Sequence, residues 1–226
     1  MSVRVESGVA PASRASAPPR PPKPQRALPK KPPKPKRWLS QLRRQLKRAA
    51  LKVVDAGWFG FVPLEAHLVI CGFPRSGTTL LQLMAETAYP SARRFGVERS
   101  GMGAANNDFP GDTRLIISKR PDDIFWIDEI RESYTWRGTR TRVRFIVSVR
   151  DPRAVLTSVH GANRDIYWVS VDRWRAIYEH FQYVRTFDDV SVVEYRDLVL
   201  NPQKVQDQLA SFIGIEPERG FAEFHK

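Results

Sequence analysis

Apolar positions recur along the chain with two different periods, and the two kinds of segment alternate from residue 63 onward. Four short, mainly apolar runs predict buried strands, at residues 67–72, 115–118, 143–149 and 191–195. Five segments with apolar residues three and four positions apart predict helices, at residues 78–88, 121–134, 152–159, 171–186 and 202–213. Strands that alternate with helices favour a parallel sheet covered on both faces. We therefore expect an α/β fold of three layers, with a mostly parallel central sheet flanked by helices.

The pattern before residue 63 is different. Residues 1–37 are rich in Pro, Lys and Arg and poor in large apolar groups, which predicts a disordered basic tail. Within it, "RALPKKP" either is a ligand for a proline-recognition domain or arises by chance in so proline-rich a tract. Residues 38–62 predict a basic amphipathic helix and a linker, whose apolar stripe either lies on a membrane surface or, as is commoner, packs on the domain. Residues 63–226 form the domain.

The charge of the chain is concentrated in its first part. Of the 37 Lys and Arg residues, 15 lie in residues 1–52 beside a single acid, Glu6, while the remaining chain is almost neutral. A nucleic-acid binder would carry a basic strip on the domain itself, so we expect no nucleic-acid partner. The tail is instead suited to loose contact with anionic surfaces. One cysteine, Cys71, no long apolar run and no secretion signal predict a soluble, cytoplasmic protein.

A phosphate-binding loop is predicted between the first strand and the helix after it. The stretch "CGFPRSGTTLL" places Gly72 and Gly77 at the spacing of the loop in nucleotide triphosphatases, G-x-x-x-x-G-K-[ST]. Thr78 stands where that loop has its Lys, and Arg75 supplies a cation earlier in the loop. A glycine-rich turn into a helix N-terminus offers backbone N–H groups to an anion. The fold is therefore expected to be P-loop-like, although the missing Lys argues against a kinase or nucleotide triphosphatase.

A second motif, "VRFIVSVRDPRAVLTS", ends another predicted strand. Arg150 lies at the strand end, and Asp151 and Pro152 are typical of a helix start. Ser158 is expected about two turns into that helix, where its hydroxyl and Arg150 can converge on one phosphate. Alone, this turn is as consistent with a structural role as with a functional one. Asp151 is formally compatible with the Walker-B acid of a kinase or nucleotide triphosphatase.

The two motifs together resemble those of sulfotransferases that use 3′-phosphoadenosine 5′-phosphosulfate (PAPS). "PRSGTTLL" is similar to the family's 5′-phosphosulfate loop, "RDPRAVLTS" to its 3′-phosphate motif, and "VVEYRDLVLNPQKVQDQLASFIGI" to its later strand–helix segment. The resemblance covers residues 66 to 225. It implies transfer of a sulfuryl group to a hydroxyl acceptor, with PAPS as co-substrate and no metal. The PAPS-binding residues that it implies are Arg75, Ser76, Gly77, Thr78, Thr79, Arg150 and Ser158, with Tyr195 near the adenosine.

The general base is not the one that many members of the family use. Their K-T-H stretch corresponds to "SKRP", which keeps Lys119 but has Pro121 at the His position. None of the four histidines, His67, His160, His180 and His225, matches that site. "RRFGVERSG" resembles the tyrosylprotein-sulfotransferase branch, which implies Glu98 as base, with Arg75 and Lys119 stabilising the transition state. The alternatives are a surface glutamate and a solvated lysine.

The sequence identifies neither the acceptor nor whether the chain is catalytically active. A long loop is expected after Glu98, in "RSGMGAANNDFPGD", and Trp126, Trp136, Trp168 and Trp174 serve either as stacking platforms for an acceptor or as core residues. Members of the family generally continue beyond the "FIG" helix end with a basic segment that this chain lacks, which suggests a shortened chain. The alternative function is therefore a homologue that binds the nucleotide without turnover. The residues do not indicate an acceptor class or an oligomeric state.

Overall fold

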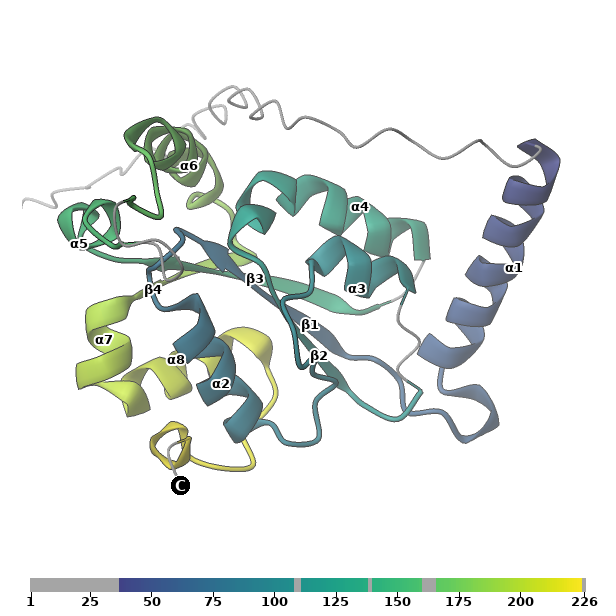
Figure 1. Ribbon diagram of the computed structural model, residues 1–226. Coiled ribbons are helices and arrows are strands. Elements are labelled where there is room, and N and C mark those ends of the chain that lie inside the picture. The colour runs from purple at the N-terminus through teal and green to yellow at the C-terminus, as the bar shows by residue number, and fades with distance from the viewer. Residues whose placement is uncertain (1–36, 108–110, 138–139, 160–165, 225–226) are drawn as a thin grey trace, which may run out of the picture.

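The structure is a computed structural model that describes residues 37–224, apart from 108–110, 138–139 and 160–165. The expected N-terminal tail and its "RALPKKP" motif lie outside these residues. The centre of the domain is a four-stranded sheet, ordered β2-β1-β3-β4, in which every neighbouring pair is parallel. Its strands are β1 (Ala66–Gly72), β2 (Leu115–Lys119), β3 (Arg142–Val149) and β4 (Val190–Glu194). Helices cover both faces of the sheet, which confirms the three-layer α/β fold (Figure 1).

The sheet is apolar on both faces because helices cover both. In β1, Leu68 and Ile70 belong to one buried cluster, while the alternating residues Val69 and Cys71 belong to the other. This alternation between two dry faces produces the continuous apolar run seen in the sequence. Burial raises the pKa of the Cys71 thiol well above its usual range. The thiol therefore behaves as a small apolar side chain.

Each face of the sheet has its own helices. On the Leu68 face lie α2 (Thr78–Ala88), α7 (Tyr195–Leu200) and α8 (Pro202–Ile213), and on the Val69 face lie α3 (Gly101–Asn107), α4 (Ile127–Arg137) and α6 (Val171–Val184). The short α5 (Pro152–Leu156) follows β3. Two single turns of 3-10 helix are η1 (Trp58–Gly60) and η3 (Phe221–Glu223), and a longer 3-10 helix, η2 (Pro121–Trp126), precedes α4. The expected helices at 78–88 and 202–213 have the expected bounds.

Three local expectations differ from the structure. The helix from 152 ends at Leu156, so Ser158 follows α5 instead of lying within it. Tyr195 is the first residue of α7 and not the last of β4. The loop expected after Glu98 contains α3, a seven-residue helix rich in Gly and Asn. Its residues favour turns over helices, and α3 forms because Asp123 of η2 accepts a hydrogen bond from the Gly101 N–H at 2.6 Å.

In the N-terminal helix α1 (Arg37–Asp55), the described side chains that are buried against the domain belong to the last turns. Leu51 and Val54 are buried, whereas Leu42 and Leu46 of the apolar stripe are exposed. Figure 1 shows α1 at one edge of the molecule, with its first turns standing clear of the sheet. Within the described residues, no helix has the length and apolar character that a membrane span requires.

Candidate functional site

The predicted phosphate loop lies at the carboxyl edge of the sheet, between β1 and α2. Gly77 adopts a positive φ of 90°, and a Cβ there would lie 2.5 Å from a ring carbon of Tyr195, so only glycine fits. Arg75 also has a positive φ, 65°, which is a strained conformation for a residue with a side chain. Glycine would adopt this backbone conformation more easily, yet the loop carries a cationic side chain here. Such strain is typical of functional loops.

Ser76 and Ser148 join this loop to the end of β3. The Ser148 hydroxyl donates to the Ser76 carbonyl at 2.7 Å, and the Ser76 hydroxyl lies 2.9 Å from the Ser148 carbonyl. Both side chains are fully buried. The role that these contacts support for Ser76 is to position the loop. Thr78 and Thr79 begin α2, where backbone N–H groups have no partner within the helix.

Arg75, Arg150 and Ser158 meet beside this helix N-terminus. The Arg75 Nε donates to the Ser158 Oγ at 2.7 Å, and the Arg150 Nη1 donates to the Arg75 carbonyl at 3.2 Å. The two arginines come from loops after β1 and β3, which are neighbours in the sheet. The structure thus brings both predicted phosphate motifs together. Ser158 contacts Arg75, although the sequence suggested that it would act beside Arg150.

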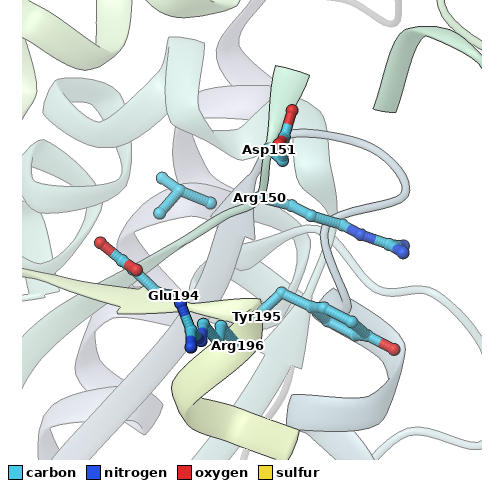
Figure 2. Close-up of a pocket in the computed structure, with 6 residues that line it drawn as sticks. Arg150, Asp151, Glu194, Tyr195 and Arg196 are labelled. Atoms are coloured by element: carbon cyan, nitrogen blue, oxygen red, sulfur yellow. The ribbon is translucent and has the colours of Figure 1, made fainter. Parts of the chain in front are cut away.

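Tyr195 fixes the position of Arg150. The guanidinium carbon of Arg150 lies 4.2 Å from the centre of the Tyr195 ring, while Gly77 contacts the same ring. Figure 2 shows the two side chains extending in the same direction, away from the Glu194 carboxylate. A cavity of about 390 Å³ opens here, lined by Val149, Arg150, Asp151, Glu194, Tyr195 and Arg196.

Among the described residues, no acidic side chain pairs with the two arginines of this site, Arg75 and Arg150. Asp151 instead caps α5 and pairs with Arg153 at 2.8 Å, and this hydrogen bond lowers the pKa of Asp151 to about 2. Two adjacent arginines beside a helix N-terminus repel each other unless an anion lies between them. The arrangement is therefore suited to binding a phosphate.

Glu98 and Lys119 lie together at the end of β2. Arg99 forms an isolated bridge with Lys119, which places the preceding residue, Glu98, beside the lysine. The Glu98 Oε2 is 3.9 Å from the Lys119 Nζ, with the glutamate half exposed and the lysine largely buried. Because β2 is parallel to β1, Lys119 lies at the same edge of the sheet as the phosphate loop. Sequence reasoning thus identified a pair of side chains that the fold brings into contact.

A second cavity, of about 430 Å³, lies next to this pair. Its lining consists of Ser100, Met102, Gly103, Asn106, Arg120 and Trp126. Asp123, which sequence reasoning missed, holds this region together: it is fully buried and accepts hydrogen bonds from Arg120 as well as from the Gly101 N–H. The only sequence signal was an Arg and an Asp three residues apart. Burial raises the pKa of Asp123 to about 6, although both hydrogen-bond donors favour its ionised form.

Asp123 is expected to make stability depend on pH. Since its pKa in the folded state lies above the ordinary value of 3.8, the folded protein binds this proton more tightly than the unfolded chain does. Its contribution is greatest below pH 4 and falls by roughly 3 kcal/mol as the pH rises through 6. Urea unfolding of the wild type and Asp123→Asn at pH 4 and pH 7 measures this effect. The stability difference between them should change by that amount, and a constant difference would show that Asp123 does not titrate in this range.

The remaining aromatic and histidine residues divide between core and surface. Trp168 lies near Arg75, with 5.9 Å between ring centre and guanidinium, and Trp174 stacks on Tyr178. His67 is buried in β1 between Ser118 and Tyr134, as a structural residue. His180 is buried in α6. His160, His225 and the Trp136 side chain lie outside the described residues.

Comparison with known proteins supports the fold. No family model and no curated protein matches the chain. Among solved structures, the chain is similar to the sulfotransferase domain from the Synechococcus PCC 7002 olefin synthase. That match has a TM-score of 0.51 and 21% sequence identity, and it covers 72% of this chain and 78% of that one. The likeness shows that the chain has the α/β fold of a sulfotransferase domain.

Proposed function

We propose that this protein transfers a sulfuryl group from PAPS to a hydroxyl acceptor. The observation that carries the proposal is the hydrogen bond from the Arg150 guanidinium to the Arg75 carbonyl beside the N-terminus of α2. It brings together two arginines without a carboxylate partner in the described chain. The fold of a sulfotransferase domain and the motifs around these arginines point to the same chemistry. Two cations in two separate motifs suit a ligand with two anionic groups.

The residues present fit a nucleotide of this kind. The N–H groups of Gly77, Thr78 and Thr79 and the Arg75 guanidinium would hold the 5′-phosphosulfate. Arg150 would hold the 3′-phosphate. Ser158 accepts a hydrogen bond from the Arg75 side chain, and the Arg75 carbonyl accepts one from Arg150. Tyr195, half-buried at the cavity and already stacked against a cation, would lie near the adenosine. When bound, PAPS supplies the sulfuryl group, which passes from a phosphate oxygen to the acceptor oxygen.

The chain's own residues would handle the proton and the charge. The Glu98 carboxylate takes the proton from the acceptor hydroxyl, and Lys119, within 4 Å of Glu98, stabilises the negative charge that develops. Arg75 donates to the phosphate oxygen from which the sulfuryl group leaves. We place the acceptor in the cavity bounded by Ser100 and Trp126, since Ser100 is two residues from Glu98. The proposal requires no metal, and we place the protein in the cytoplasm, a location with which its single cysteine is consistent.

Replacing Glu98 with glutamine is expected to lower kcat by about two to four orders of magnitude, because the amide cannot accept the proton. Binding of 3′-phosphoadenosine 5′-phosphate (PAP) should be unchanged, since Glu98 lies at β2 and the arginines at β1 and β3. Transfer from labelled PAPS to a panel of carbohydrate, lipid, peptide and small-molecule alcohols measures turnover, with Glu132→Gln, an exposed position on α4, as the matched control. PAP binding without wild-type turnover on any acceptor would favour the non-catalytic homologue. Equal activity of Glu98→Gln and the wild type would exclude Glu98 as the base.

A further inference from the structure

One exposed stripe of α1 is apolar. Successive helix positions are 100° apart, so Leu42, Leu46, Ala49 and Ala50 share one side, and all four are exposed. Leu51, which is buried against the domain, lies on the opposite side of the helix from Leu42. The sequence left open whether this stripe packs on the domain or lies on a membrane. Its last residue, Val54, is buried, whereas these four residues are turned away from the domain. Water-exposed leucines at 46% and 62% of their full accessible area mark a surface for contact with something else.

The turn after α1 adds exposed aromatic side chains. Trp58 and Phe59 are 62% and 88% exposed. Phe59 has a positive φ of 56°, a strained conformation that directs a bulky apolar side chain into water. The segment is held in place, because the Val62 N–H donates to the Gly111 carbonyl at 2.9 Å. Trp and Phe on a fixed turn beside an apolar helix are typical of proteins that insert side chains at the surface of a lipid bilayer.

Charge decides what covers this surface. Residues 37–60 contain six Lys and Arg residues and one acid, Asp55. The N-terminal tail of the same chain is also basic, and a second copy would present the same positive helix, so both are repelled. An anionic bilayer offers both an apolar interior for the leucines and aromatics and negative headgroups for the basic residues.

We propose that α1 and the turn Gly57–Phe61 form a membrane-binding surface, hereafter the α1 surface, which attaches the protein to anionic lipid bilayers without spanning them. Leu42, Leu46, Trp58 and Phe59 enter the boundary between headgroups and acyl chains, and the exposed Arg43 and Lys52 contact the headgroups. This attachment does not depend on the nucleotide site, which lies at the carboxyl edge of the sheet, whereas α1 lies at one side of the molecule (Figure 1).

Sedimentation of the full chain with vesicles tests the proposal. Vesicles of phosphatidylcholine with 30% phosphatidylglycerol should bind the wild type at least about tenfold more strongly than pure phosphatidylcholine vesicles do. The double variant Leu42→Ser/Leu46→Ser should lower binding about tenfold, in 0.5 M salt as well as at low salt. The matched control is Leu83→Ser/Leu200→Ser, at leucines that are 50% and 61% exposed elsewhere on the domain, and it should bind like the wild type. Equal binding of both double variants, as electrostatic attachment by the tail alone would give, overturns the proposal.

A second measurement does not rely on a variant that weakens binding. Brominated acyl chains quench the fluorescence of tryptophans that enter the bilayer. Because Trp38 also lies on α1, both the reference protein, otherwise wild type, and the variant below carry Trp38→Phe in this measurement. Trp58 is then the tryptophan of the α1 surface that is expected to be quenched. Trp58→Phe keeps an apolar side chain and should bind vesicles like the wild type, while the quenching should be lost. Quenching that persists in Trp58→Phe, or its absence from the wild type when bound, would show that the turn stays outside the membrane. Binding of the full chain to acidic proteins but not to vesicles would overturn the proposal as well.

Discussion

Replacing Arg75 with alanine is expected to lower the kcat of sulfuryl transfer by about two to three orders of magnitude, the usual effect of removing one charge-stabilising donor from an active site. Arg75 lies next to the N-terminus of α2, and its guanidinium donates to Ser158 while its carbonyl accepts from Arg150. Arg114→Ala removes an exposed arginine just before the amino end of β2 and should leave kcat unchanged. Steady-state kinetics on the three proteins measures the effect, and a loss in Arg75→Ala of less than about threefold would contradict the assigned role.

The strained backbone of Arg75 makes the same position informative about stability. Glycine adopts a φ of 65° freely, so Arg75→Gly should be at least as stable as the wild type while losing activity as Arg75→Ala does. Arg75→Ala retains the strain and should be less stable than Arg75→Gly by about 1 kcal/mol. Urea unfolding of both variants measures the difference. Lower stability in Arg75→Gly than in Arg75→Ala would mean that the strain is not stored at this residue.

Replacing Gly72 with alanine is expected to be the most destabilising single methyl addition among the described glycines. Gly72 has a φ of 119°, and a Cβ there would lie 2.6 Å from the carbonyl oxygen of Ser148, at the pairing of β1 with β3. The clash is with backbone at the centre of the sheet, where neither strand can move without breaking the ladder. We expect the free energy of unfolding to fall by about 4 kcal/mol or more.

Gly60→Ala is the matched control for this substitution. Gly60 also has a positive φ, 82°, but a Cβ there would meet no atom within 4 Å. It should lower stability only by the backbone penalty, about 1–2 kcal/mol. Denaturant unfolding of both variants therefore separates the clash from the conformational preference. Similar losses in the two would show that β1 and β3 can separate enough at Gly72 to admit a methyl group.

The parts of the fold that the sequence predicted well are those in which local pattern and tertiary environment agree. The four strands are buried on both faces, so their apolar runs are continuous, and α2 and α8 begin and end at strong local signals such as Gly77, Pro202 and Gly214. The candidate site followed because Arg75 and Arg150 each lie within three residues after such a strand, and carboxyl ends of neighbouring parallel strands share one edge.

The features that the sequence did not predict depend on contacts between distant residues. The helix α3 forms in a Gly- and Asn-rich stretch because Asp123, 22 residues later, accepts the Gly101 N–H. Ser158 lies beyond α5, in a segment that pairs with residues near Trp168, and for that reason it faces Arg75. The apolar stripe of α1 was expected either to pack on the domain or to lie on a membrane surface. Its last residue, Val54, packs together with Leu51, while Leu42 and Leu46 are exposed. Spacing alone identifies an apolar stripe but not the surface that it faces.

The measurement that tests the central claim most directly is a thermal-denaturation titration of the wild type with PAP, compared with AMP and with ATP plus magnesium. A ligand that binds only the folded state stabilises it by about 2.7 kcal/mol at a hundredfold excess over Kd. Arg75 and Arg150 lie in separate motifs and have no carboxylate partner among the described residues. This predicts stabilisation by PAP, which carries both a 5′- and a 3′-phosphate, and a much smaller effect of the other two ligands. Stabilisation by ATP with magnesium, or by AMP as strongly as by PAP, would contradict the assignment of a PAPS site to this edge of the sheet.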